Sequence, residues 1–166
     1  MKKLFEKYRE IIMYLIFGVL TTVVGMGTYF LLMKGAEYLP GVSMEDETSA
    51  TYIAIYVAAQ IIQWVAAVLF AFFTNRKWVF IEADQSKDSM GRQLTLFAGS
   101  RVASLLLDMA ATYGCTLLLD LWITTPPVVL GIALTPGVLA KVIAAALVVI
   151  ANYALSKLIV FRKKKD

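Results

Sequence analysis

An arginine, a serine and an aspartate lie at helical spacing within a long apolar stretch of the sequence. Arg101, Ser104 and Asp108 are separated by three and four residues, which places them on one face of a helix. A guanidinium presents a planar fork of donors that fits a phosphate, and a carboxylate accepts hydrogen bonds from sugar hydroxyls. Internal partners for both charges, or an arginine side chain that extends to the water interface, are the ordinary alternatives. We favour a phosphate ligand for Arg101 and leave both explanations open for Asp108.

Four further polar residues lie where the second and fourth apolar stretches end. They are Asn75, Arg76, Asn152 and Lys157. At ~1.5 Å per helical residue, Asn152 lies roughly as deep as Arg101. A hydrogen bond to a neighbouring helix would account for Asn152, and an ordinary basic flank would account for the others. A site for a charged headgroup is the alternative, and the residue types do not decide between the two.

Three more polar side chains lie inside the apolar stretches. Gln60 and Gln63 are three residues apart and offer their amides to a sugar or to a neighbouring helix, and we favour the helix. Lys141 lies near one end of the fourth stretch, and we expect it to extend outward to water. Gly18 and Gly25 favour close helix packing more than a binding site.

The elements that must position these residues are long apolar runs. Of the 166 residues, 60% are hydrophobic and 17% are charged, and the mean hydropathy is +0.73. Four runs are each long enough for a helix to cross ~30 Å of hydrocarbon. They cover residues 11–33, 51–73, 94–119 and 138–161. The sequence therefore predicts an all-α integral membrane protein with four transmembrane helices, in which residues 1–166 form one domain. The first run is too long for a signal peptide, so we expect it to be retained.

The residue types that carry most enzyme chemistry are missing from the sequence. It has no histidine and a single cysteine, Cys115, which excludes Ser-His-Asp and Cys-His catalysis and an intrachain disulfide. It has no phosphate-cradling glycine loop either. We therefore expect a protein that is not an enzyme and that uses no metal and no cofactor.

Lysine and arginine are unevenly distributed among the connections. They cluster before the first run, between residues 76 and 92, and after the fourth run, whereas residues 34–50 carry one lysine and four acidic residues. By the positive-inside rule, both termini face the cytoplasm. The net charge of +4 arises in these flanks, so anionic lipid is a better partner for it than nucleic acid.

The chain resembles itself after a shift of 81 residues. The shift superposes Gly18 on Gly99, Arg76 on Lys157, and Val79-Phe80 on Val160-Phe161. Each half holds two spans, so both halves enter and leave the membrane on the same side. We therefore predict a duplicated helical hairpin, a parallel repeat whose halves are related by an axis along the membrane normal.

Short motifs in a fixed order resemble the GtrA-like family. They are the segments 17–22 (FGVLTT) and 75–80 (NRKWVF), the pair Asn152-Tyr153, and Lys157 followed by Val160-Phe161. The likeness covers nearly the whole chain. It implies four spans, a place in the bacterial cytoplasmic membrane, and a part in glycosylation of surface polysaccharide or teichoic acid. Members of the family are thought to move polyprenyl-phosphate-linked sugars from the inner to the outer leaflet.

The resemblance also implies roles for the polar residues. In a flippase of this kind the phosphate is held near the cytoplasmic leaflet while the sugar passes through the bundle. The residues for the phosphate are Arg101, Asn75, Arg76, Asn152 and Lys157, and those along the route of the sugar are Asp108, Gln60 and Gln63. The expected partners are the lipid-linked sugar, membrane lipids, a membrane glycosyltransferase and a second copy of the chain.

Two other functions are compatible with a small protein of this size. A non-transporting accessory subunit that anchors a membrane glycosyltransferase is the main alternative, and the sequence does not separate it from a flippase. A small multidrug exporter has a similar length. Such exporters typically need a carboxylate in the first span, however, and none lies between Glu10 and Glu37.

The topology is tested by fusing to each terminus a reporter that is active on one side of the membrane only. We expect a cytoplasmic signal from both ends, because basic residues flank both. An external signal from either end would contradict the assignment.

Overall fold

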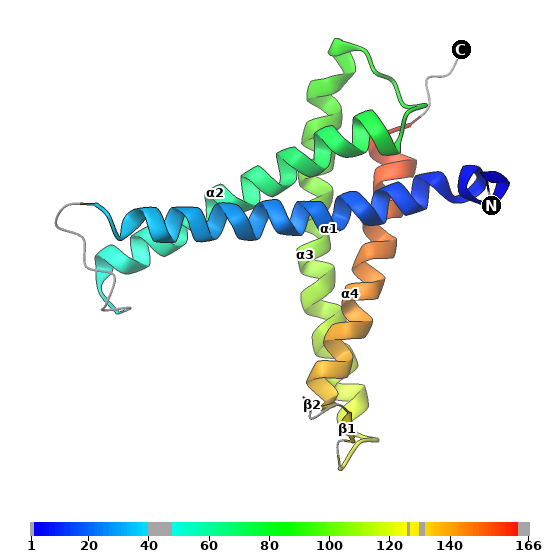
Figure 1. Ribbon diagram of the computed structural model, residues 1–166. Coiled ribbons are helices and arrows are strands. Elements are labelled where there is room, and N and C mark those ends of the chain that lie inside the picture. The colour runs from blue at the N-terminus through cyan, green and yellow to red at the C-terminus, as the bar shows by residue number, and fades with distance from the viewer. Residues whose placement is uncertain (1, 40–47, 126, 130–131, 163–166) are drawn as a thin grey trace. The chain divides into compact units, whose positions relative to one another are not determined.

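Long helices make up most of the chain. The computed structural model describes residues 2–39, 48–125, 127–129 and 132–162 (Figure 1). The helices are α1 (Lys2–Ala36), α2 (Ala50–Thr74), α3 (Lys87–Asp120) and α4 (Pro136–Leu155). Single π turns, η1 (Asn75–Val79) and η2 (Ser156–Val160), follow α2 and α4, and a short antiparallel strand pair, β1 (Val128–Val129) and β2 (Ile132–Ala133), precedes α4.

Four helices in the described part of the chain are long and apolar enough to cross a membrane. Their apolar segments are Tyr8–Ala36, Ala50–Val79, Lys87–Asp120 and Pro136–Val160. This confirms the prediction of an all-α protein with four spans, to which only the two-residue strands are added. Two charged segments that the predicted topology uses lie outside the described residues. They are the acidic residues Glu45, Asp46 and Glu47 between the first two spans and the basic residues 163–165 of the tail.

Helices α2 and α4 each begin after a residue whose side chain accepts a hydrogen bond from a backbone amide of the first turn. The Ser49 side chain accepts a hydrogen bond from the Tyr52 amide at 3.1 Å, at the start of α2. Thr135 does the same for the Val138 amide at 3.3 Å, and Pro136 takes the first position of α4.

The start of α3 differs from the sequence prediction. The third apolar run begins at residue 94, and the polar residues before it predict a connection, but α3 already begins at Lys87. The reason lies in Asp84, whose carboxylate accepts from the Ser86 amide at 2.9 Å. Its carbonyl accepts from the side chains of Ser89 and Gln93 at 3.0 and 2.9 Å. These bonds hold polar residues in a helix that hydrophobic patterning alone does not reveal.

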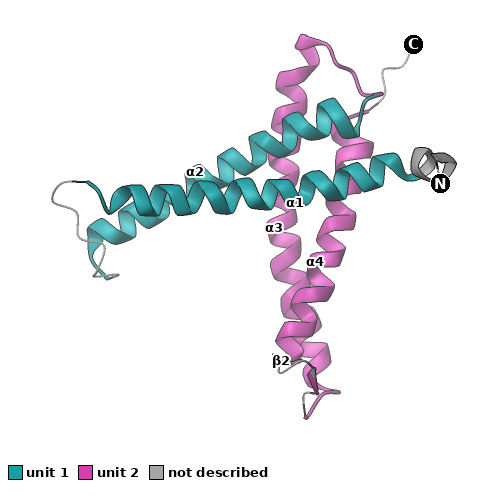
Figure 2. Ribbon diagram, viewed as in Figure 1, with its two compact units in different colours: residues 1–81 teal, residues 82–166 magenta. Residues whose placement is uncertain are grey.

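The chain divides into two compact units, residues 1–81 and 82–166 (Figure 2). Each unit is a helical hairpin, with α1 packed on α2 and α3 packed on α4. In unit 1 the Phe80 ring lies 6.4 Å from the Tyr14 ring. In unit 2 the Phe161 ring lies 5.9 Å from the Phe97 ring. An aromatic pair therefore closes each hairpin at the end where its second helix finishes.

The two π turns have the same local geometry at positions 81 residues apart. The Phe80 amide donates to the Asn75 carbonyl at 2.8 Å, and the Phe161 amide donates to the Ser156 carbonyl at 2.8 Å. Both phenylalanines leave the helical conformation, with φ, ψ of −96°, 63° and −103°, 49°. The shared turns agree with a duplicated hairpin. The rotational relationship of the halves and the side of the membrane that holds the termini stay predictions.

Gly25 lies at the closest approach between α1 and α2. A Cβ at this position would lie 2.9 Å from the Gln63 side-chain oxygen, whereas a Cβ at Gly18 would have no neighbour within 4 Å. The sequence predicted close packing for both glycines, and the structure places it at Gly25.

We expect Gly18→Ala to raise the melting temperature in detergent, because alanine favours a helix over glycine by ~1 kcal/mol. Gly25→Ala should gain nothing, because the new methyl displaces Gln63 and costs a hydrogen bond worth about 1 kcal/mol. Equal stabilisation by the two substitutions would show that the contact at Gly25 is unimportant.

Candidate functional site

Arg101 lies on α3 with its guanidinium over an aromatic ring. The Arg101 Cζ atom is 4.6 Å from the centre of the Phe97 ring, and the Phe97 side chain is fully buried. A cation over a ring face at a site that is not fully desolvated is stabilised by about 0.5–1 kcal/mol. Within the described part of the chain, no carboxylate or carbonyl accepts a hydrogen bond from this guanidinium. Its planar fork of donors is therefore open to a ligand.

Buried polar side chains lie at the same depth in unit 2. Counted from the Phe97–Phe161 contact at ~1.5 Å per residue, Ser156 is about level with Arg101, and Asn152 is about level with Ser104. Ser104, Asn152 and Ser156 are buried. The Ser104 hydroxyl donates to the Arg101 carbonyl at 2.9 Å.

Two of these buried groups have no partner in the described residues. They are the Asn152 Oδ1 and Ser156 Oγ atoms. A buried polar atom without a hydrogen bond costs about 1–3 kcal/mol. A ligand or a water molecule that satisfies them is therefore favoured, and unit 2 places the unpartnered atoms near the depth of the open guanidinium.

Lys157 follows Ser156 in the second π turn. Its ammonium donates to the Tyr153 hydroxyl at 3.2 Å and lies 5.5 Å from the centre of the same ring. The side chain is exposed, so the charge stays at the surface of unit 2.

The first π turn repeats this order of residues in unit 1. Asn75 is 3% exposed, and its Oδ1 has no partner in the described residues. Arg76, half-buried, stands where Lys157 stands in the second turn. Each π turn thus begins with a buried polar side chain that a cation follows. Single π turns inside membrane or soluble helices are frequent at functional sites.

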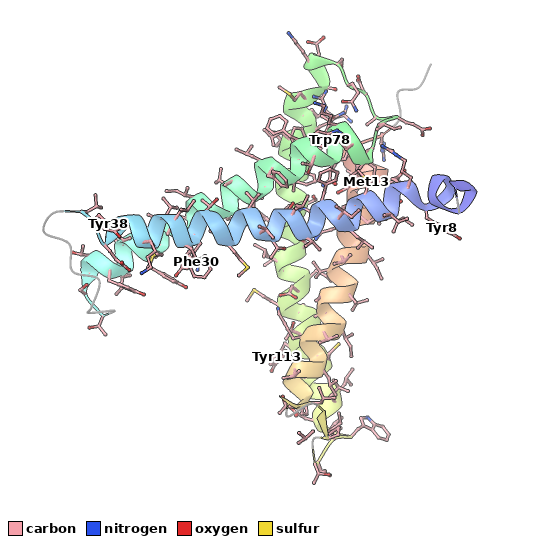
Figure 3. The ribbon with its side chains drawn as sticks, viewed as in Figure 1. Tyr8, Met13, Phe30, Tyr38, Trp78 and Tyr113 are labelled. Carbon is pink, nitrogen blue, oxygen red and sulfur yellow. The ribbon has the colours of Figure 1, made fainter. Side chains whose placement is uncertain are left out.

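Neighbouring contacts fix the first π turn against α1. Arg9 donates to the Trp78 carbonyl at 3.1 Å, and the Trp78 ring stacks on Phe17 at 5.3 Å. Figure 3 shows Trp78 at the same end of unit 1 as Met13, with Tyr38 at the opposite end. These contacts hold η1 in place while leaving the Asn75 oxygen unpaired.

Gln60 and Gln63 hydrogen-bond along their own helix. Gln63 donates to the Gln60 oxygen at 3.2 Å, and Gln60 donates to the Tyr56 hydroxyl at 3.0 Å. The favoured contact with a neighbouring helix is found only as the approach of Gln63 to Gly25. Gln63 lies twelve residues before Asn75, or ~18 Å along the helix, so the two are not parts of one compact site.

Asp108 forms an ion pair with Lys141. The ammonium of Lys141 on α4 donates to Asp108 Oδ2 on α3. The expectation that Lys141 extends outward to water is therefore wrong, because a carboxylate of the facing helix is a better partner in a region of low dielectric. Arg101 and Asp108 do not pair with each other, in line with their separation of two turns.

Sequence reasoning missed three contributors to these sites. The Phe97 ring lies beneath the Arg101 guanidinium, Ser156 supplies a buried hydroxyl, and Lys141 forms an ion pair with Asp108. The 81-residue shift places Ser156 on Asn75 and could have identified it. Among the residues that the structure describes, no three His, Cys, Asp or Glu side chains are grouped closely enough to hold a metal ion.

Four membrane-length helices with cations and amides in their spans define a multi-pass α-helical membrane protein. The family model described as "GtrA/DPMS, transmembrane domain" matches residues 13–161, and the chain belongs to this family.

Bacterial relatives cover almost all of the chain. The uncharacterized membrane protein YwcD of Bacillus subtilis is 31% identical, over 93% of this chain and 98% of its own. The cell wall teichoic acid glycosylation protein GtcA of Listeria monocytogenes is 32% identical, over 96% of this chain and 90% of its own. No solved structure matches the chain. Together with the four apolar helices, these relatives identify a multi-pass protein of the bacterial membrane.

The two intramembrane cations should respond differently to alanine. Arg101→Ala removes only a cation–π contact, so we expect a loss of at most about 1 kcal/mol in lipid-free detergent. Lys141→Ala leaves Asp108 without a partner, and because the pair is partly exposed we expect a loss of roughly 1–3 kcal/mol. Thermal unfolding of both variants checks this. A marked loss for Arg101→Ala would reveal an internal partner for the guanidinium.

Proposed function

We propose that this protein moves a polyprenyl-phosphate-linked sugar across the cytoplasmic membrane for glycosylation of a cell-surface polymer such as teichoic acid. The open guanidinium of Arg101 is the observation that carries the proposal. An unpaired cation inside a span costs several kcal/mol, and a lipid phosphate would offset that cost. The name of the relative GtcA, a cell wall teichoic acid glycosylation protein, supports the choice of pathway.

In this proposal the phosphate binds in unit 2 beside Arg101. The planar fork donates two parallel hydrogen bonds to phosphate oxygens. The Ser156 hydroxyl lies at similar depth, lacks a partner in the described residues and can donate to the ligand. Asn152 can donate through its amide nitrogen, while its unpartnered Oδ1 accepts only from a water molecule or a sugar hydroxyl. Lys157 attracts the headgroup from the surface of the same unit.

Unit 1 contributes a second group of donors at its own π turn. Asn75 and Arg76 receive the headgroup at the cytoplasmic surface, where the proposed topology places the end of α2. Gln60 and Gln63 lie deeper and form a short row of amides that can exchange hydrogen bonds with sugar hydroxyls. The polyprenyl tail stays in lipid along the exposed apolar faces of the helices.

The direction of transport follows from consumption of the sugar. The sequence has no nucleotide-binding loop, so the protein equilibrates the lipid-linked sugar between leaflets. A membrane glycosyltransferase that uses the sugar on the outer side pulls the equilibrium outward. Such an enzyme and a second copy of this chain are the proposed protein partners.

A non-transporting accessory subunit is the second candidate. In that case the phosphate site would retain the lipid-linked sugar beside a glycosyltransferase without carrying it across. Pure protein in liposomes separates the two, because only a flippase exchanges substrate between leaflets without the enzyme.

The test uses proteoliposomes and a water-soluble isoprenyl-phosphate hexose whose uptake is measured. We expect wild type to accelerate uptake. Arg101→Lys keeps the charge but loses the fork, so uptake should fall about tenfold, and Arg101→Ala should fall about a hundredfold, as expected for charge-assisted hydrogen bonds of about 1.5–3 kcal/mol.

Arg92→Ala is the matched control, since Arg92 is an exposed cation near the start of the same helix. Its uptake should equal that of wild type. If the wild-type protein fails to exchange the probe yet stimulates a glycosyltransferase, the accessory function is correct. Equal losses for Arg92→Ala and Arg101→Ala would show a nonspecific effect of positive charge.

A further inference from the structure

The Asp108–Lys141 pair joins the two helices of unit 2 inside their apolar segments. Neither side chain has another partner in the described part of the chain. An ammonium has three N–H donors, and only one of those of Lys141 is used, by Asp108 Oδ2. Two donors of a membrane-embedded cation therefore remain available to a ligand.

The position of the pair relates it to the proposed phosphate site. Asp108 lies seven residues beyond Arg101 on the same helix, ~10 Å further along it and on the same face. The side chains are not enclosed, since 59% of Lys141 and 26% of Asp108 is exposed. A phosphate that leaves Arg101 along this face of α3 next meets Lys141.

A purely structural role explains these observations less completely. Ion pairs removed from water are poor sources of stability, and apolar residues of similar volume often serve equally well. A pair kept only to join α3 and α4 also has no need for open donors. A cation that must bind and then release an anion does need a carboxylate that competes for it.

We propose that Lys141 is a second phosphate-binding station, which rests on the proposed function and adds a step to it. The phosphate group of the lipid-linked sugar displaces the Asp108 carboxylate from Lys141 and accepts hydrogen bonds from the ammonium. Asp108 then returns to Lys141 as the phosphate departs. The competition keeps the station weak enough to release its ligand, as required of any site on a conduction route.

The first arm of the test measures binding of a polyprenyl phosphate without sugar to purified protein in detergent. Asp108→Asn removes the competitor but keeps the cation. We expect it to bind the lipid about tenfold more tightly, the equivalent of one charge-assisted hydrogen bond. Exchange in proteoliposomes should fall about tenfold, because release from Lys141 is slowed. Unchanged binding by Asp108→Asn overturns the proposal.

Glu37→Gln is the matched control. It frees Lys34 from an exposed ion pair at the end of α1, with an Nζ to Oε1 distance of 3.2 Å. Lipid binding and exchange should both stay at wild-type levels. Tightening equal to that of Asp108→Asn would show that any liberated lysine suffices, which overturns the proposal.

The second arm uses the doubly neutral variant Asp108→Asn/Lys141→Met, which removes the pair without leaving an unpaired charge. It should melt at the wild-type temperature and still bind polyprenyl phosphate through Arg101, but its exchange should fall at least tenfold. Wild-type exchange by this variant would mean that the pair only joins the helices.

The two arms separate failure of the station from failure of the proposed function. If wild type shows no exchange while Asp108→Asn still binds the lipid more tightly, Lys141 is a phosphate site in a protein that does not transport. If wild type exchanges the probe and Asp108→Asn binds as wild type does, transport proceeds without the station.

Discussion

The hydrocarbon core of a membrane supplies no water, so every polar group placed there needs a partner from the protein or from a lipid. This constraint accounts for the main features of the structure. The backbone satisfies itself in four helices, and η1 and η2 end two of them with i→i+5 bonds. Among the charges, Asp108 takes Lys141 as its partner, whereas Arg101 has only the face of Phe97. The guanidinium is thus an exception to the rule of internal pairing, and the constraint itself points to a ligand from the lipid phase.

Much of the architecture follows from the sequence because bilayer thickness fixes the length of a span. The four apolar runs therefore predict the four helices, and each run lies almost entirely within the corresponding helix. The π turns could not be predicted, since the choice between i→i+4 and i→i+5 bonding depends on packing around Phe80 and Phe161. The early start of α3 was also missed, because the hydrogen bonds to Asp84 are made by polar residues that hydrophobic patterning assigns to a loop.

The candidate site was predictable in its residue types but not in its pairings. An arginine and an aspartate inside an apolar run are unusual enough to be noticed without a structure. Their partners depend on how far α3 slides along α4, which helix lengths do not give. Asp108 lies twelve residues before the end of α3, and Lys141 lies five residues after the start of α4, so distances from the connecting segment place them at different depths. Only the packed hairpin shows that the two side chains meet.

The same pair bears on how the chain enters a membrane during synthesis. Thirty-three residues separate Asp108 from Lys141, and a ribosome adding ~5–20 residues per second needs roughly 2–7 seconds to make them. During that interval the carboxylate of α3 has no lysine to neutralise it. Transfer of α3 from the translocon into lipid costs more free energy while its carboxylate is unpaired. Release of α3 together with α4, after Lys141 has been made, avoids that cost. Residues 82–166 are in this sense one unit of insertion as well as one unit of packing.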